Sequence, residues 1–264
     1  MKINKIKYLL IASFMFVFAA CDSIVDEQHL TDSTDVTGVE LVATQSTPGG
    51  NKVTLKMATP GVTGYWDYSL DKALTDEVTF VYPIPGKTTF TYVGTLGSQF
   101  FTKTIDVQID QLDTRLEQDW YDLVSEDTNA GKTWVFDNSG PGSLWWYMSP
   151  DIPNGGRDKW ATVWWNAGDC CPPGDATGKM HFDLNKAANY YHYENQTATP
   201  TKGSFKLNIK NKELIILDSK ILGYAAGNAD GKYEIIELTE DRLVLHLSNN
   251  EANKTGWTFI YRPE

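Results

Sequence analysis

Short runs of alternating hydrophobic and polar residues fill most of the chain and predict an all-β protein. In the first half such runs occur at 52–57, 78–82, 89–93 and 101–107, separated by turns rich in glycine and proline. Successive side chains of a strand point to opposite faces, so each run offers one hydrophobic face for burial. Because no segment here has helical periodicity, we interpret residues 38–110 as a small all-β sandwich.

Residues 111–264 predict a second β domain that begins with a short helix. Leu112, Leu116, Trp120 and Leu123 recur at helical spacing among acidic residues. Strands are expected at 205–209, 213–217, 233–238, 243–247 and 257–261. The last of these strands places three aromatic residues on one face, which we expect to point into the core. Short strands at this spacing are typical of a jelly-roll-like β-sandwich, which we predict for this domain.

The N-terminus has the pattern of a bacterial lipoprotein signal peptide. Lysines precede an apolar run, Tyr8–Phe18, that is too short to span a membrane comfortably. Ala19, Ala20 and Cys21 follow, and small residues before a cysteine resemble a lipobox. The resemblance implies a signal peptide at 1–21 and lipidation of Cys21. The alternative is an ordinary signal peptide with a chance cysteine.

Residues 22–37 are polar and lack aromatic side chains, so we interpret them as a flexible tether. Asp22, Asp26 and Glu27 resemble the acidic export signal of Bacteroidetes lipoproteins. That resemblance implies a lipid-anchored protein on the outer membrane, facing the cell exterior. The chain would then contact the membrane only through its lipid anchor.

The overall charge narrows the class of partner. The formal net charge is −11, which disfavours nucleic acids and anionic lipids because both require Lys and Arg to neutralise phosphate. The acidic surface also disfavours a strongly anionic glycan, because like charges repel. Among polysaccharides and oligosaccharides, a neutral one is therefore the better candidate.

Five tryptophans between residues 144 and 166 are the most unusual feature of the sequence. They are Trp145, Trp146, Trp160, Trp164 and Trp165. Neighbouring side chains of a strand face opposite ways, so each Trp-Trp pair is predicted to send one ring inward and one outward. Two outward rings on adjacent strands would form a flat aromatic surface of the kind that usually marks a binding site. The alternative is that about half of the rings only pack the core.

Carbohydrate is the ligand that such a surface suits. A pyranose ring presents a face of C–H bonds to an indole ring, while its hydroxyls need polar partners that fix orientation. Asp151, Asn154, Arg157 and Asp158 lie in the loop between the tryptophans and could supply them. We predict a carbohydrate-binding site formed by these four residues and the five tryptophans.

Cys170 and Cys171 are adjacent, and they are the only thiols that remain if Cys21 is lipidated. In an oxidising compartment adjacent cysteines close only as a strained vicinal disulfide. Such a disulfide is flat and apolar, and we include both cysteines in the predicted carbohydrate surface. Two free thiols in a surface loop are the alternative. A metal site is disfavoured because no histidine or third cysteine lies nearby.

The sequence lacks the common catalytic signatures of hydrolases. It contains neither a Gly-x-Ser-x-Gly nor a His-Glu-x-x-His motif. Glycoside hydrolysis requires two carboxylates across a cleft, whereas Glu234, Glu237 and Glu240 belong to a plain predicted hairpin. We predict a binding protein with no catalytic residues, and we expect no organic cofactor.

The N-terminal domain resembles a PKD-type immunoglobulin-like domain. Tyr65-Trp66-Asp67-Tyr68 stands where that family has Trp-Asp-Phe-Gly-Asp-Gly, and the segment 82–91 matches its Tyr-x-x-Pro-Gly-x-Tyr-x-Val-x pattern. The resemblance implies a spacer without a ligand, and it makes calcium the one structural ion to consider. Ser69-Leu70-Asp71 replaces the Gly-Asp-Gly turn, which weakens the argument for calcium.

The whole arrangement resembles the surface glycan-binding lipoproteins of Bacteroidetes polysaccharide-utilisation loci. Besides the lipobox, tether and spacer, the segments 131–137, 164–168 and 233–239 are similar to the C-terminal domain of that group. The resemblance implies capture of polysaccharide beside a SusC/SusD-like outer-membrane complex, with a β-glucan such as laminarin as the first ligand to try. A glycoside hydrolase or lyase on the same fold and a purely structural partner of such a complex are the rival interpretations.

Overall fold

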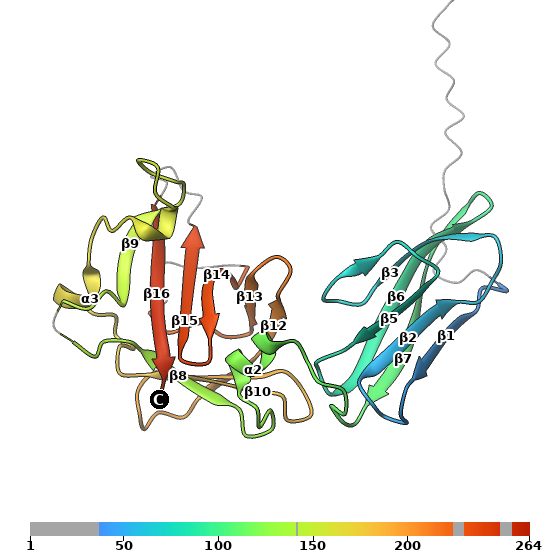
Figure 1. Ribbon diagram of the computed structural model, residues 1–264, viewed down its shortest axis with the longest axis horizontal. Helices are drawn as coiled ribbons and strands as arrows, with labels where there is room; N and C mark the ends of the chain where they lie inside the picture. The colour runs from blue at the N-terminus through green and yellow to red at the C-terminus, as the bar shows by residue number, and fades with distance from the viewer. Residues whose placement is uncertain (1–36, 141, 224–229, 249–254) are drawn as a thin grey trace, which may run out of the picture.

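The computed structural model describes residues 37–140, 142–223, 230–248 and 255–264. These residues form two β domains that lie side by side, a sandwich and a barrel (Figure 1). The predicted all-β class is confirmed, since strands dominate and the described helices are short. The predicted signal peptide, Cys21 and the tether up to residue 36 lie outside the described residues. None of the described helices has both the length and the hydrophobicity that a bilayer crossing requires.

The N-terminal domain is a sandwich of two antiparallel sheets. Its strands are β1 (Leu41–Gln45), β2 (Lys52–Met57), β3 (Val62–Asp67), β4 (Lys72–Ala73), β5 (Glu77–Val81), β6 (Gly86–Leu96) and β7 (Gln99–Ile109). One sheet has the order β1-β2-β5, and the other has the order β4-β3-β6-β7. The domain is therefore a seven-stranded β-sandwich with three strands in one sheet and four in the other.

Hydrophobic alternation places the core of this sandwich between its two sheets. In β2, Val53, Leu55 and Met57 are buried, while Lys52 and Lys56 on the opposite face are exposed. Two further aromatic residues complete the centre of the core. Trp66 has no exposed surface and packs edge-on against Tyr92, with the ring centroids 5.1 Å apart. The alternation predicted from sequence is confirmed here.

The C-terminal domain is built from α2 (Gln118–Val124) and nine strands. These are β8 (Lys132–Phe136), β9 (Trp146–Pro150), β10 (Lys179–Asp183), β11 (Asn189–Tyr193), β12 (Thr201–Asn208), β13 (Glu213–Leu217), β14 (Lys232–Thr239), β15 (Arg242–Ser248) and β16 (Thr255–Pro263). From β10 to β16 each strand pairs antiparallel with the next, and β8 pairs with both β10 and β16. Eight strands therefore close into a ring, and β9 pairs with the other half of β16 as a continuation of β8.

This strand order corrects the jelly-roll-like sandwich that we predicted for residues 111–264. In a jelly roll, long connections carry the chain back and forth between two sheets. Here nearly every strand pairs with its neighbour in sequence, and the β15–β16 and β16–β8 pairings close the sheet on itself. The result is an up-and-down barrel. The strands predicted between residues 205 and 261 occur as β12 to β16. The helix is shorter than its predicted repeat, since Leu112 and Leu116 precede α2 and only Trp120 and Leu123 lie in it.

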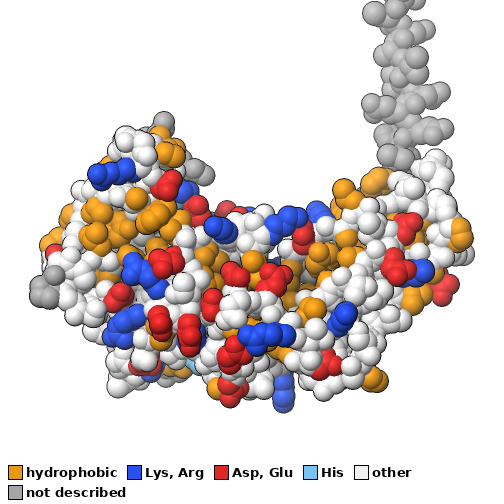
Figure 2. Space-filling model, in the orientation of Figure 1, with side chains coloured by type: hydrophobic (Ala, Val, Ile, Leu, Met, Phe, Trp, Pro, Cys, Tyr) orange, Lys and Arg blue, Asp and Glu red, His pale blue; other side chains and the backbone are white. Residues whose placement is uncertain are grey.

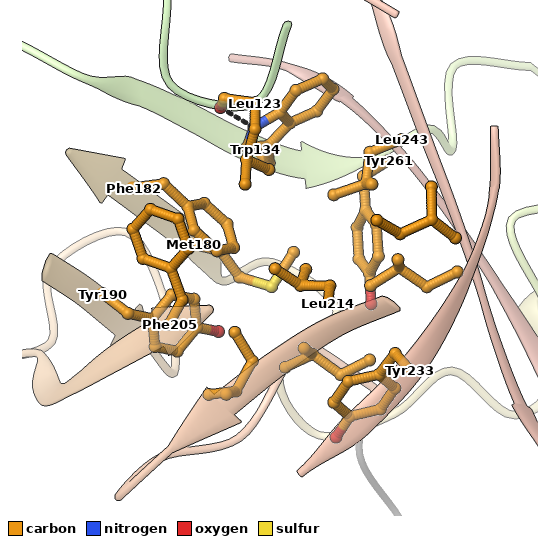
Figure 3. Packing of buried hydrophobic residues seen from close by; sticks show 14 of the residues in the cluster. Leu123, Trp134, Met180, Phe182, Tyr190, Phe205, Leu214, Tyr233, Leu243 and Tyr261 are labelled. Atoms are coloured by element: carbon orange, nitrogen blue, oxygen red, sulfur yellow. Dashed lines mark hydrogen bonds between the residues drawn. The ribbon is translucent and has the colours of Figure 1, made fainter. Parts of the chain in front are cut away.

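The barrel is filled by side chains and covered at both ends. At one end α2 inserts Trp120 and Leu123, and the indole N–H of Trp134 donates to the Leu123 carbonyl oxygen at 2.9 Å. At the other end the segment after β13 buries Ile221 and Leu222, and the Tyr261 hydroxyl donates to the Leu222 carbonyl oxygen at 2.7 Å. Figure 3 shows the aromatic and aliphatic residues that converge inside the ring. The interior is thus a packed core, and a ligand-binding surface must be sought outside it.

Apolar contacts and an ion pair join the two domains. Leu70, Ile84 and Leu112 each pack against both hydrophobic cores. On the surface, Lys210 of the barrel forms an ion pair with Asp71 of the sandwich at 3.0 Å.

Candidate functional site

The five tryptophans of the 144–166 region separate into buried and exposed pairs, and the predicted alternation within each pair is wrong. Trp145 and Trp146 are both buried, with 5% and 6% of their surfaces exposed. Trp164 and Trp165 are both exposed, at 42% and 43%. The fifth, Trp160, is partly buried in the short 3₁₀ helix η1 (Lys159–Ala161).

The first pair is buried because Trp145 precedes the strand and the chain turns between the two residues. Trp145 contacts Phe136, with ring centroids 4.7 Å apart, and its other side is covered by Gly168 of α3 (Ala167–Cys170). A Cβ at position 168 would lie 2.6 Å from the indole ring, so only glycine fits there. Trp146, the first residue of β9, stacks on Trp257.

The second pair is exposed because it lies outside a regular strand. The backbone around Trp164 and Trp165 pairs with Met148 alone, through an N–H from Trp164 to the Met148 carbonyl and one from Met148 to the Trp165 carbonyl, both at 2.9 Å. This single bridge covers the outer edge of β9. The ring of Trp165 then reaches Trp257, with centroids 6.2 Å apart and an interplanar angle of 64°.

Exposed hydrophobic side chains concentrate in this region. Eight large hydrophobic residues of the described chain are exposed, and five of them form what we call the aromatic surface: Leu144, Ile152, Val163, Trp164 and Trp165. Figure 2 shows hydrophobic side chains gathered over the part of the barrel that contains β9 and β16. Single exposed hydrophobic residues are ordinary, whereas a local group of this kind indicates a binding surface.

A groove of about 590 Å³ lies on the outside of the barrel, next to the aromatic surface. Its floor is the small cluster of Tyr147, Val244 and Ile260, which project outward from β9, β15 and β16. Leu144, Trp160 and Val163 line its sides. We call this the outer groove.

Three charged side chains line the outer groove at one side. Arg242 pairs with Glu237, with Nε and Oε2 3.1 Å apart, and lies 3.9 Å from a carboxylate oxygen of Asp137. A β-bulge in β14 between Ile235 and Glu237 shifts the register, so that Glu237 lies opposite Val244 of the groove floor. Bulges commonly re-aim a side chain next to a functional site. The guanidinium and the two carboxylates can donate and accept hydrogen bonds without movement of the backbone.

The loop that carries Trp160 is fastened to the barrel. The Tyr147 hydroxyl donates to the Trp160 carbonyl oxygen at 2.9 Å, and burial raises the pKa of Tyr147, so this hydroxyl stays protonated. One residue earlier, the Lys159 ammonium donates to Ser248 at 3.0 Å and pairs with Glu234 at 2.5 Å. These contacts fix the wall of the outer groove before any ligand arrives.

A buried histidine lies beneath the same loop. His246 is 1% exposed, and its Nδ1 lies 3.1 Å from the Thr258 hydroxyl and 3.4 Å from the Ser149 hydroxyl. Burial, with a smaller contribution from the nearby Lys159 charge, lowers the pKa of His246 to about 3. The ring is therefore neutral at physiological pH and serves as a structural hydrogen-bonding group.

The polar residues predicted from sequence lie around the aromatic surface but do not line the outer groove. Asn154 and Arg157 close an exposed turn through two backbone hydrogen bonds of 3.1 Å, and Asp158 precedes η1. Asp151 is partly buried. The groove instead uses Glu237 and Arg242 of the β14–β15 hairpin together with Asp137, which follows β8. The predicted hairpin brings Glu237 and Arg242 together, but no local sequence pattern signals the approach of Asp137.

Cys170 and Cys171 lie exposed at the C-terminal end of α3, the helix that packs on Trp145. Their Sγ atoms are 2.6 Å apart in a thiol–thiol contact. The contact with Cys170 raises the pKa of the Cys171 thiol. Neither residue lines the outer groove.

Within the described residues, no group of three or more His, Cys, Asp or Glu side chains could hold a metal ion. No protein-family model matches the chain, and no curated protein matches it. The arguments for function therefore rest on the geometry of the outer groove and the aromatic surface.

Proposed function

We propose that this protein binds a neutral polysaccharide through the outer groove and the adjoining aromatic surface, without cleaving it. The observation that carries the proposal is the gathering of five exposed hydrophobic residues beside a groove with charged hydrogen-bonding groups at its side. Sugar rings combine an apolar face with a belt of hydroxyls, so they fit a site that offers both kinds of contact.

The two parts of the site would play different roles. Trp160 lines the groove and Trp164 lies exposed beside it, so their rings can stack on the C–H faces of sugar units. Asp137, Glu237 and Arg242 are held by mutual ion pairs and can exchange hydrogen bonds with hydroxyl groups. Because the loop is already fastened, binding costs little additional ordering of the protein.

Charge favours a neutral glycan. The charged lining of the outer groove consists of two carboxylates and one guanidinium, which leaves one excess negative charge. The net charge of −11 for the chain acts in the same direction. A β-glucan such as laminarin is the first ligand to try, on the strength of the resemblance to surface glycan-binding lipoproteins.

The rest of the chain would hold the binding domain at the cell surface. We propose that Cys21 carries a lipid that anchors the protein on the outer membrane, and that the sandwich acts as a PKD-type spacer beside a SusC/SusD-like complex. Replacing Cys21 by Ala should release the protein from the membrane fraction. A C21A variant that stays in that fraction would count against lipidation.

A glycan array combined with a hydrolysis assay tests the proposed function. We expect retention on neutral glucans, weak retention on sulfated or uronic-acid polymers, and no release of reducing ends from laminarin. Binding to no glycan would favour a structural role.

Steady release of reducing ends would favour a glycoside hydrolase, the second candidate function. One observation supports it: Asp137 and Glu237 both line the groove, and glycosidases use two carboxylates. If this candidate is correct, the E237Q variant should lose turnover while still binding glycan.

A further inference from the structure

A second cavity lies between the two domains, away from the outer groove. It has a volume of about 420 Å³, and residues of the sandwich, of the segment before α2 and of the end of β12 line it. Figure 2 shows the surface hollowed between barrel and sandwich, with hydrophobic and charged side chains around the hollow. We call this cavity the interdomain cleft. Ligand sites in proteins occur preferentially at such domain junctions.

The sandwich side of the cleft presents a pair of stacked aromatic rings. Tyr68 and Phe80 lie nearly parallel, with centroids 4.3 Å apart and an interplanar angle of 17°. Both rings are only partly buried, and both line the cleft. From the barrel side, Leu207 and Ile209 of the β12 end add apolar surface.

The charges that line the cleft are balanced. Asp71 and Glu117 contribute two carboxylates, while Arg115 and Lys210 contribute two cations. Asp71 and Lys210 pair across the domain boundary at 3.0 Å, and Arg115 pairs with Glu126 at 2.9 Å, so most of this charge is already neutralised. An ion of either sign gains little from such a lining, whereas a neutral ligand with many hydroxyls can use its donors and acceptors.

From these contacts we infer that the interdomain cleft is a second binding site for a neutral oligosaccharide, with Tyr68, backed by Phe80, as its stacking ring. The inference rests on the proposed function of the outer groove and extends it. Two sites on one chain can engage the same polysaccharide, and the second contact then forms at a high effective concentration. The affinity for a polymer would exceed that of either site for a short oligosaccharide.

Calorimetric titration of the full mature chain with laminarihexaose tests this inference. We expect two molecules bound per chain in the wild type and one in Tyr68→Leu, which removes the ring from the cleft. Tyr65→Leu is the matched control, because Tyr65 lies in β3 under Lys72 and does not line the cleft. This control should keep two sites.

A second variant tests the inference even if Tyr68→Leu fails to fold. Glu117 is exposed and lines the cleft, so Glu117→Trp fills the cavity without disturbing a buried contact. It should also reduce the number of sites to one. One site in the wild type that is lost in Trp160→Ala would overturn the inference and leave the proposed function intact. No binding at all would overturn both.

Discussion

Trp146 stacks on Trp257 with their ring centroids 4.7 Å apart and their planes inclined by 22°. The pair joins β9 to the strand next to it, β16, near the end of the barrel that is closed by the segment before Gly223. Trp165, at the outer edge of β9, contacts Trp257 edge-on, with ring centroids 6.2 Å apart. A buried ring, a partly buried ring and an exposed ring thus follow one another from the core to the surface.

This row predicts very different costs for two similar substitutions. Trp146→Ala should lower the free energy of unfolding by about 3–5 kcal/mol, because it leaves a large cavity beside Trp257. Trp165→Ala, at a residue that is 43% exposed, should lower it by no more than about 1 kcal/mol. Urea unfolding of both variants measures the difference.

Trp146→Phe provides the control for this comparison. It keeps a ring on Trp257 and removes an indole N–H that has no hydrogen-bond acceptor among the described residues. It should therefore cost clearly less than Trp146→Ala. Equal destabilisation by the alanine variants at positions 146 and 165 would contradict the burial described here.

His246 predicts a loss of stability in mild acid. Its folded-state pKa of about 3 lies below the usual value of 6.5, so the unfolded chain binds more protons between these two pH values. The contribution of the neutral ring is complete above about pH 6.5 and declines as the pH falls toward 3. Urea unfolding at pH 7.5 and pH 5 should show lower stability at pH 5.

The variant His246→Gln separates this effect from that of the carboxylates. It cannot take up a proton in this range, so the drop between the two pH values should be smaller than in the wild type. His181, whose pKa burial also lowers, stays in place in both proteins and contributes equally. An unchanged drop in the variant would show that His246 does not govern the acid sensitivity.

The adjacent thiols predict a redox-dependent mass. Protein secreted into an oxidising compartment and purified without reductant should carry a Cys170–Cys171 disulfide, since the two Sγ atoms are already in contact. Its intact mass should be lower by two hydrogens than after reduction, and it should not react with a thiol-alkylating reagent. Two alkylated cysteines in unreduced protein would favour the free thiols.

The charged residues at one side of the outer groove predict which charge of ligand the protein prefers. Replacing both Asp137 and Glu237 by their amides leaves Arg242 without its acidic neighbours and makes the lining net positive. This double variant should bind carboxymethylated laminarin more tightly than the wild type does, as measured by affinity electrophoresis. A matched double amide variant at Glu40 and Asp113, in the N-terminal half of the chain, should show no such gain.

Much of the fold could be predicted from hydrophobic alternation. The strands from β12 to β16 occur at the expected places, because each has one face that must be buried, whereas the helix near Trp120 begins later than its predicted repeat. Alternation does not say which strands pair at the ends of the sheet. A barrel and a sandwich bury the same residues, so the closing contact between Tyr261 of β16 and Phe136 of β8 could not be anticipated.

The candidate site was predicted only in part. The region with exposed tryptophans was found from its composition, but the exposed members were not, since Trp164 and Trp165 pair with a single residue of β9 and follow no strand pattern. Glu237 and Arg242 meet within one hairpin, but Asp137 reaches Arg242 only because the barrel brings the end of β8 beside that hairpin. The sequence carries no sign of this contact with Asp137.

Affinity electrophoresis of the double variant Trp160→Ala/Trp164→Ala in native gels with laminarin tests the central claim most directly. Phe100→Ala is the matched control, since it removes an exposed aromatic ring in the sandwich. We expect the double variant to bind at least about tenfold more weakly, a loss of about 1.4 kcal/mol, while Phe100→Ala binds like the wild type. If laminarin retards the double variant as strongly as the wild type, binding through this surface is contradicted.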